Sequence, residues 1–259
     1  MPSPVRMLQL MWSLLCCMEF VLVAANDEAA PTLRLLSYNI HHAEGTDGVL
    51  DVARIARIIT ESGADVAALQ EMDKQTRRTL GVDQAARLAA LLGWHHVFGK
   101  ALHFQGGMYG LAVLSRWPIQ AHRVYALPYR VGQEPRIALE ALVLPDNGLP
   151  RLRLFNTHLC HLSEATRQEQ VQRLLQVIPR KDALPILLAG DFNARPGSMP
   201  MEPFWAGGWK DLLGKHQGID YLLAPEDSPF EVRSARIMHF PLASDPMPVL
   251  AELRYMDGS

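Results

Sequence analysis

Short apolar segments alternate with amphipathic segments along most of this chain, and this alternation limits the possible folds more than any other feature. Residues 33–40 and 65–71 have the length and apolar content of buried strands. Between them, apolar side chains recur at helical spacing across residues 49–62, and Gly63 follows as a helix stop. The same alternation continues towards the C-terminus, so the sequence predicts an α/β domain with large mixed sheets.

The remaining expected elements repeat these two patterns. Apolar residues at helical spacing predict helices around residues 85–92 and 171–178, which Gly93 and Pro179 follow. No linker-like stretch interrupts residues 26–259, and 49% of all residues are hydrophobic, so we expect one domain with a sizeable core. Runs of apolar and β-branched residues predict further strands at 108–114, 137–144, 152–159, 185–189, 219–223, 232–238 and 248–255.

The N-terminal segment 1–25 has the features of an export signal. It is mostly apolar behind a short start with one arginine, and it ends in Val-Ala-Ala, which is typical of a cleavage site. Glu19 interrupts the apolar stretch, which disfavours a stable membrane span. We therefore expect a cleaved signal peptide and a secreted or periplasmic domain at 26–259, with an uncleaved membrane anchor or a misassigned start as alternatives. Cleavage would leave Cys160 as the one cysteine and exclude an intramolecular disulfide.

The net charge is close to zero. The 25 Lys and Arg residues are balanced by 27 Asp and Glu residues, which gives a formal charge of −2 at pH 7. This balance argues against a protein that holds nucleic acid mainly through non-specific charge. It leaves open an enzyme that cleaves phosphoric esters with the help of a bound cation, since the cation supplies positive charge locally.

Polar residues gather where several of the expected strands end. Because strands that share a sheet edge bring their ends together, this recurrence predicts one site at that edge. The side chains offer mainly carboxylate and amide oxygens, which suit Mg²⁺ or Mn²⁺. The clusters are Ser37-Tyr38-Asn39, Gln70-Glu71, Asn156-Thr157-His158, Gly190-Asp191-Phe192-Asn193 and Ser244-Asp245.

The histidines give no indication of a zinc site. None are spaced as two ligands on one face of an expected helix, and the domain has no cysteine pair. Two pairs are adjacent in sequence, His41-His42 and His95-His96. Neighbouring side chains of a strand point to opposite faces, so we expect neither pair to bind a metal ion jointly.

Five short motifs follow one another in a defined order: Tyr38-Asn39, Leu69-Gln70-Glu71, Asn156-Thr157-His158-Leu159, Gly190-Asp191-Phe192-Asn193-Ala194 and Ser244-Asp245. This order resembles the metal-dependent endonuclease/exonuclease/phosphatase superfamily. That group includes deoxyribonuclease I-like nucleases, neutral sphingomyelinases and inositol polyphosphate phosphatases. The resemblance runs across residues 32–255, and it implies a four-layer sandwich of two mixed β-sheets flanked by helices.

The resemblance also implies the metal and phosphate ligands. Glu71 would be the principal metal carboxylate for Mg²⁺ or Mn²⁺, with Asn39 and Asp245 beside it. The cation would neutralise charge that develops on the phosphoryl group. Arg136 and Tyr109 would contact the substrate phosphate, Arg136 through its bidentate guanidinium.

Four further residues would carry the chemistry by the same resemblance. Asp191 would orient or deprotonate the attacking water, and Asn193 would position water or phosphate beside it. His158 would donate a hydrogen bond to a phosphate oxygen. Asp220 resembles the carboxylate that orients a histidine at the family's last motif.

That last motif departs from the family pattern. The family has Ser-Asp-His, whereas this chain has Pro246 after Ser244-Asp245. Proline has neither a titratable group nor a side-chain donor, and losing such a donor costs on the order of 10²–10³ in rate by analogy with oxyanion-hole deletions. His161 and His239 are possible substitutes.

The sequence therefore predicts a Mg²⁺- or Mn²⁺-dependent hydrolase of phosphoric esters, with phosphodiesters preferred. Nucleic acid and a phospholipid headgroup are both open as substrates, and we expect a monomer with no obligate protein partner. The alternative is a catalytically inactive family member that binds a phosphorylated ligand or a partner. Pro246 favours that alternative, and the other motif residues favour an active site.

Two further features have two interpretations each. Lys74, Arg77 and Arg78 form a basic run that either faces solvent or meets an anionic substrate. The aromatic residues 204, 205 and 209 either pack in the core, which we prefer, or stack on a ligand.

Overall fold

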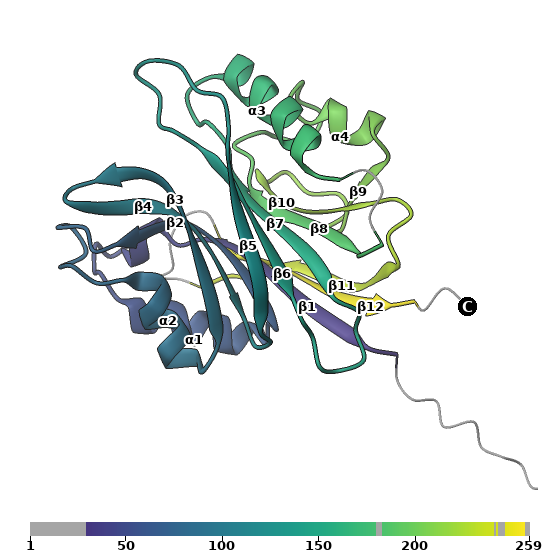
Figure 1. Ribbon diagram of the computed structural model, residues 1–259, viewed down its shortest axis with the longest axis horizontal. Coiled ribbons are helices and arrows are strands. Elements are labelled where there is room, and N and C mark those ends of the chain that lie inside the picture. The colour runs from purple at the N-terminus through teal and green to yellow at the C-terminus, as the bar shows by residue number, and fades with distance from the viewer. Residues whose placement is uncertain (1–29, 180–182, 241, 243–246, 257–259) are drawn as a thin grey trace, which may run out of the picture. The chain divides into compact units, whose positions relative to one another are not determined.

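The computed structural model, which describes residues 30–179, 183–240, 242 and 247–256, contains two six-stranded mixed sheets (Figure 1). The helices are α1 (Val52–Ser62), α2 (Gln84–Leu92), α3 (Glu164–Val177) and α4 (Glu202–Ala206), and a short 3-10 turn, η1 (His41–Ala43), follows the first strand. The strands are β1 (Thr32–Asn39), β2 (Val66–Lys74), β3 (His95–Phe104), β4 (Gly107–Ser115), β5 (Ile119–Ala126), β6 (Ile137–Val143), β7 (Leu152–His158), β8 (Ile186–Asp191), β9 (Trp209–Asp211), β10 (Asp220–Pro225), β11 (Phe230–Ile237) and β12 (Val249–Tyr255).

The two sheets share one pairing scheme. The first has the strand order β11-β12-β1-β2-β4-β3, and the second has the order β5-β6-β7-β8-β10-β9. In each sheet the two central strands are parallel, β1 with β2 and β7 with β8, and every other pair is antiparallel. Because the carboxyl ends of parallel strands lie at the same edge, each sheet presents two strand ends side by side.

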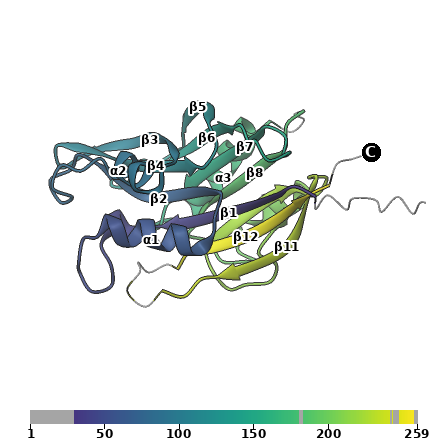
Figure 2. The same cartoon turned by 90° about the horizontal axis from the view of Figure 1, so that it is seen from below.

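The four-layer sandwich is confirmed. Figure 1 and Figure 2 show α1 and α2 on the outer face of the first sheet, and Figure 1 shows α3 and α4 over the second. Apolar side chains fill the space between the sheets, and separate apolar clusters join each sheet to its helices. Examples between the sheets are Leu35, Val113 and Leu154. The helices contribute Ile55, Ile59 and Leu88 from α1 and α2, and Val171, Leu174 and Phe204 from α3 and α4.

Most of the expected elements occur with shifts of a few residues at their ends. Helix α1 begins after Asp51, whose carboxylate accepts a hydrogen bond from the amide of Arg54 at 2.9 Å, and Gly63 ends it with φ of 70°. Strands β5 and β9, helix α4 and the turn η1 were not predicted from the sequence, and of β3 only the His95-His96 pair was expected on a strand. Residues 101–110 form the end of the β3–β4 hairpin. Within the described part of the chain, no helix is long and apolar enough to cross a membrane.

Several predictions concern residues that the structure does not describe. The signal peptide at 1–25, Asp245 and Pro246 all lie outside the described residues. The described residues from Pro31 onwards form one compact unit. The boundary at residue 26, the cleavage and the place of export therefore stay predictions.

A β-bulge in β2 sets the direction of Glu71. The sequence predicted that this strand ends at Glu71, but β2 continues to Lys74 and carries one extra residue between Leu69 and Met72 relative to β4. Glu71 has a φ of 58°, which is unusual for a residue other than glycine. The extra residue lets Met72 return to the helix-facing side, while Glu71 stays partly exposed.

A buried side-chain amide from the other sheet donates hydrogen bonds to backbone carbonyls beside the bulge. The side-chain NH₂ of Asn156, in β7, donates to the carbonyls of Leu69 and Ala112 at 2.9 Å each. Its oxygen accepts a hydrogen bond from Nε2 of Gln70 at 2.8 Å. Both side chains are fully buried, so the amide pair joins the two sheets directly behind Glu71.

Replacing this amide should destabilise the whole domain. We expect Asn156→Ala to lower the free energy of unfolding by about 3 kcal/mol, because two buried carbonyls and the Gln70 donor lose their partner. Urea denaturation measures the loss. Asn147→Ala removes an exposed hydrogen bond to the carbonyl of Thr32 and should change stability by less than about 0.5 kcal/mol. Equal effects of the two variants would contradict this role for Asn156.

Candidate active site

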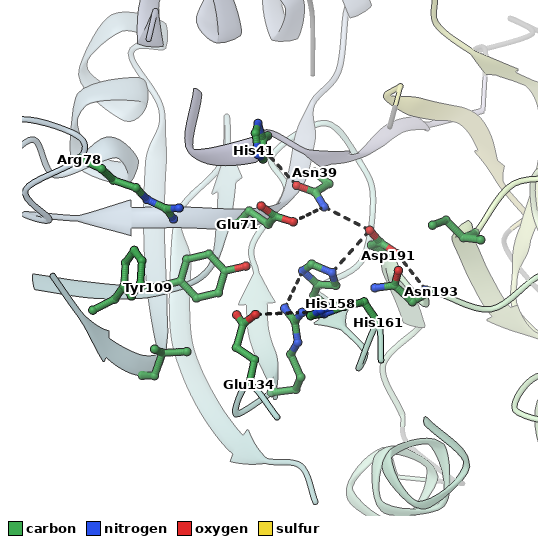
Figure 3. Close-up of a pocket in the computed structure, with 14 residues that line it drawn as sticks. Asn39, His41, Glu71, Arg78, Tyr109, Glu134, His158, His161, Asp191 and Asn193 are labelled. Carbon is green, nitrogen blue, oxygen red and sulfur yellow. Dashed lines mark hydrogen bonds and ion pairs between the residues drawn. The ribbon is translucent and has the colours of Figure 1, made fainter. Parts of the chain in front are cut away.

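The ends of the two parallel strand pairs meet at one cavity. Asn39 ends β1, Glu71 lies on the β2 bulge, His158 ends β7 and Asp191 ends β8 (Figure 3). The cavity has a volume of about 520 Å³. Its lining residues are Asn39, His41, Glu71, Arg78, Leu102, Phe104, Tyr109, Glu134, Arg136, His158, His161, Asp191, Asn193 and Ile219. The structure thus brings together seven of the nine predicted site residues; Asp220 lies outside this lining, and Asp245 is not described.

Asn39 links the carboxylates of two other predicted residues. Nδ2 of Asn39 donates to Oε1 of Glu71 at 2.9 Å and to Oδ2 of Asp191 at 3.1 Å. Asn39 and Asp191 are buried, whereas the Glu71 side chain remains partly open to the cavity. Two carboxylates and an amide within such short reach suit a hard cation that keeps part of its water shell. This donor chemistry fits the predicted Mg²⁺ or Mn²⁺ site.

Asp191 is held by a tight turn at the end of β8. Gly190 precedes it with φ of 154°, and a Cβ atom there would lie 2.1 Å from the carbonyl oxygen of Thr157 in β7, so only glycine fits. The amide N–H of Asn193 donates to Oδ1 of Asp191 at 2.9 Å, and Nδ2 of Asn193 donates to the carbonyl of Leu159 at 3.0 Å. Burial raises the pKa of Asp191 above its usual value, and the hydrogen bonds from Asn193 and Asn39 act in the opposite direction.

His158 is a neutral hydrogen-bond donor. Burial lowers its pKa well below the usual value, and the charge of Arg136 acts in the same direction. The guanidinium of Arg136 approaches Nδ1 of His158 at 2.9 Å. Because a guanidinium only donates, Nδ1 accepts and the proton lies on Nε2. That nitrogen is 3.6 Å from Oδ2 of Asp191 and lies beside the cavity (Figure 3).

Two residues that the sequence did not assign to the phosphate group hold Arg136 in place. The guanidinium nitrogen NH2 lies 3.3 Å from Oε2 of Glu134 and 3.3 Å from Nδ1 of His161. His161 was expected only as a substitute for the missing histidine. Glu134 has no motif that indicates its role, since it lies in an irregular segment before β6. Tyr109, from β4, also lines the cavity, and burial raises its pKa well above the usual value.

The planar fork of Arg136 should matter more than its charge. We expect Arg136→Lys to lower kcat/KM by about 10²-fold, because an ammonium cannot contact His158 and Glu134 in the same geometry. Steady-state kinetics on the substrate that the wild type turns over fastest measures the effect. Arg153→Lys is the matched control, since Arg153 bonds Glu140 outside the cavity and should leave kcat/KM unchanged. Retention of full activity by Arg136→Lys would contradict the assignment.

Asp220 lies behind Asp191. It begins β10, pairs with Asp191 across the sheet and is buried. Its Oδ1 has no hydrogen-bond partner among the described residues. Burial raises the pKa of Asp220 well above its usual value, and the nearby charge of Asp191 adds to the rise. His239, the other expected substitute for the missing histidine, does not line the cavity.

Part of the basic run reaches the cavity. Arg78 lines it, stacks at 4.7 Å over the ring of Phe104 and pairs with the buried carboxylate of Asp73 at 2.6 Å. Lys74 instead pairs with Asp83 at 2.9 Å. The aromatic segment packs in the core as expected, with Phe204 fully buried.

The prediction that His41 and His42 diverge is wrong. They do not continue β1 but form η1, where both have positive φ, and their rings lie 4.4 Å apart. Side chains of a tight turn do not alternate as those of a strand do, so the two rings share one side. His95 and His96 do lie on a strand, β3.

Several solved structures share this fold. A structure from Beutenbergia cavernae described as endonuclease/exonuclease/phosphatase has 25% identity and a TM-score of 0.70, covering 87% of this chain and 72% of that one. A mannosyl-6-phosphatase from Bacteroides thetaiotaomicron has 19% identity and a TM-score of 0.70, covering 86% and 100%. ANGEL2, described as a 2′,3′-cyclic phosphatase, has 16% identity and a TM-score of 0.65, covering 87% and 95%.

No curated protein matches the sequence. The model of the endonuclease/exonuclease/phosphatase family matches residues 36–245, which include every predicted site residue. The chain therefore belongs to the endonuclease/exonuclease/phosphatase family of metal-dependent phosphoester hydrolases.

Proposed function

We propose that this protein is a Mg²⁺- or Mn²⁺-dependent hydrolase of phosphoric esters with a preference for phosphodiesters. The observation that carries the proposal is the convergence of Asn39, Glu71, His158 and Asp191 in one cavity, with Arg136 beside them. These residues come from four strands of two sheets, and surface polar groups without a shared role would not meet in this way.

Each group has a defined task in such a reaction. Glu71 and Asn39 would hold the cation, which supplies positive charge to the phosphoryl oxygens when bound. Oδ2 of Asp191 would accept the proton of the attacking water or orient it, since this carboxylate is buried and fixed by Asn39 and Asn193. The Nε2–H of His158 would donate to a non-bridging phosphate oxygen, and Arg136 keeps that proton on Nε2.

The formal charge of the cavity supports a diester. Three carboxylates and two guanidinium groups line it, and buried Asp73 pairs with Arg78 from behind, so these groups together carry a formal charge of −2. One divalent cation makes them neutral overall, which leaves no excess positive charge for the second negative charge of a monoester. The apolar side chains of Leu102 and Phe104 form a wall on which an organic group of the substrate can pack.

The cavity constrains the alcohol groups of the substrate less than its phosphate group. Nucleic acid and phospholipid headgroups both present a phosphodiester, and we retain both as substrates of an exported, monomeric enzyme. The structural neighbours named a mannosyl-6-phosphatase and a 2′,3′-cyclic phosphatase share this fold, so the fold by itself does not select the ester.

A second function is favoured by one observation. Oδ1 of Asp220 is buried without a hydrogen-bond partner in the described part of the chain, and the family's histidine is replaced by Pro246. An inactive protein that binds a phosphorylated ligand in the same cavity would carry this change without loss of function.

The full chain should be assayed on bis(para-nitrophenyl) phosphate and on para-nitrophenyl phosphate, each with Mg²⁺, with Mn²⁺ and with EDTA. We expect metal-dependent turnover that is faster on the diester, falls to background with EDTA and returns when the cation is added back. Glu71→Gln should raise the Mg²⁺ concentration needed for half-maximal activity. Absence of turnover on these esters, on DNA and on phospholipid vesicles would overturn the hydrolase proposal and favour the binding protein.

A further inference from the structure

Two histidines and a carboxylate surround one point at the edge of the cavity. Among the described residues, His41, His42 and Glu71 each offer one ligand atom, and these atoms all lie within 4.8 Å of one another. Bonds of about 2.0–2.2 Å to one ion would require the ligand atoms to close to about 3–4 Å, a shift of roughly 1 Å. His41 is exposed and lines the cavity next to Glu71, so its ring has room for that shift (Figure 3).

An unusual backbone presents the two rings. His41, His42 and Ala43 have φ values of 46°, 43° and 64°, a region that residues other than glycine rarely adopt. Hydrogen bonds hold this conformation: Oδ1 of Asn39 accepts from the amide of His41 at 3.1 Å, and the carbonyl of His42 accepts from Nε2 of Gln84 at 2.6 Å. The strain is thus fixed by neighbouring elements, and it places both imidazoles on the side of Glu71.

The hydrogen bonds of the two rings each leave one nitrogen free to bind a metal ion. Nε2 of His42 lies 3.3 Å from Oε2 of Glu44, and Nδ1 of His41 lies 3.4 Å from the carbonyl oxygen of the same residue. A ring nitrogen that donates to a carboxylate or carbonyl leaves the other nitrogen with a free lone pair, which is how metal-binding histidines are usually oriented. Nδ1 of His42 is buried and has no hydrogen-bond partner within the described residues.

We propose that His41, His42 and Glu71 form a second divalent-cation site that selects ions with a preference for imidazole, such as Zn²⁺, Co²⁺ or Mn²⁺. Two nitrogen donors distinguish it from the all-oxygen set of Asn39, Glu71 and Asp191, which suits Mg²⁺. The carboxylate of Glu71 is common to both sets. The positive charge of Arg78 near His42 is offset by its ion pair with buried Asp73. The proposal does not depend on the hydrolase activity.

Filling this site would change the electrostatics of the cavity. A second cation adds two positive charges to the walls. The charge of the cavity would then favour a dianionic monoester over a monoanionic diester. A transition metal ion would then raise the ratio of monoester to diester turnover relative to Mg²⁺ alone.

Binding can be measured without an activity assay. The metal-free full chain, prepared without a histidine tag, is titrated with Co²⁺ while the visible absorption that reports nitrogen coordination is recorded. We expect one equivalent of Co²⁺ to produce this absorption in the presence of excess Mg²⁺. His41→Gln and His42→Gln should each weaken binding at least tenfold, since each removes one of three ligands.

Two controls separate this site from the proposed active site and from general histidine binding. The double variant His95→Gln/His96→Gln removes the exposed pair on β3 and should bind Co²⁺ as the wild type does. Asp191→Asn should also bind Co²⁺ normally although we expect it to lose most of the hydrolase activity. No visible absorption in the wild type, or absorption unchanged in both His41→Gln and His42→Gln, would overturn the proposal. Circular dichroism shows whether each variant is folded. Because His41 is exposed, His41→Gln should stay folded and test the proposal even if His42→Gln unfolds.

Discussion

Asp191→Asn should lower kcat by about 10³-fold and leave the fold intact. The asparagine keeps the shape of the side chain and its contact with the amide of Asn193. It removes the negative charge that would accept the proton of the attacking water, and its new NH₂ group would face the Asn39 amide across the present 3.1 Å contact. The side chain is buried, so bulk water cannot restore the lost function.

Asp211→Asn is the control for this prediction. Asp211 also belongs to the second sheet, where its carboxylate lies 2.8 Å from Nε2 of His216, but it does not line the cavity. Its substitution should leave kcat within about twofold. Thermal denaturation should give both variants melting temperatures within a few degrees of the wild type. If Asp191→Asn retained more than a tenth of the wild-type kcat at saturating Mg²⁺, another group would have to activate the water.

Pro246→His should raise kcat/KM by on the order of 10²–10³. The family carries a histidine at this position of the Ser-Asp-His motif, and this chain retains Asp220, the carboxylate that the resemblance assigns to orienting it. Oδ1 of Asp220 is buried with no partner among the described residues. A restored imidazole would give this oxygen a donor and give the phosphate a further hydrogen bond.

A double variant tests the mechanism of this gain. Asp220→Asn in the Pro246→His background should remove most of the gain, whereas Asp220→Asn alone should change the wild-type rate little. Pro248→His places an imidazole two residues further along and should give no gain. An active wild type that Pro246→His does not improve would mean that another group, such as His161, already supplies the missing contact.

Local pattern predicted most of the strands, and together with the family resemblance it predicted most of the site. Apolar strands followed by helices imply parallel pairing, and the carboxyl ends of parallel strands share an edge. For that reason the polar residues that end β1, β7 and β8 could be placed together from the sequence, and the motif order identified the family. Asn39, His158 and Asp191 do meet at this edge.

The layered fold, the edge at which the site forms and most of the residues that build it follow from strand periodicity and motif order, so the sequence was enough to predict them. The direction in which Glu71 turns into the cavity was not predictable, since the bulge in β2 depends on an amide of Asn156 from the other sheet. Nor was the approach of His41 and His42 to one point, because Gln84 from a distant helix holds their strained turn. Both features need partners that lie far away along the chain, and the fold brings these partners together where no local pattern specifies them.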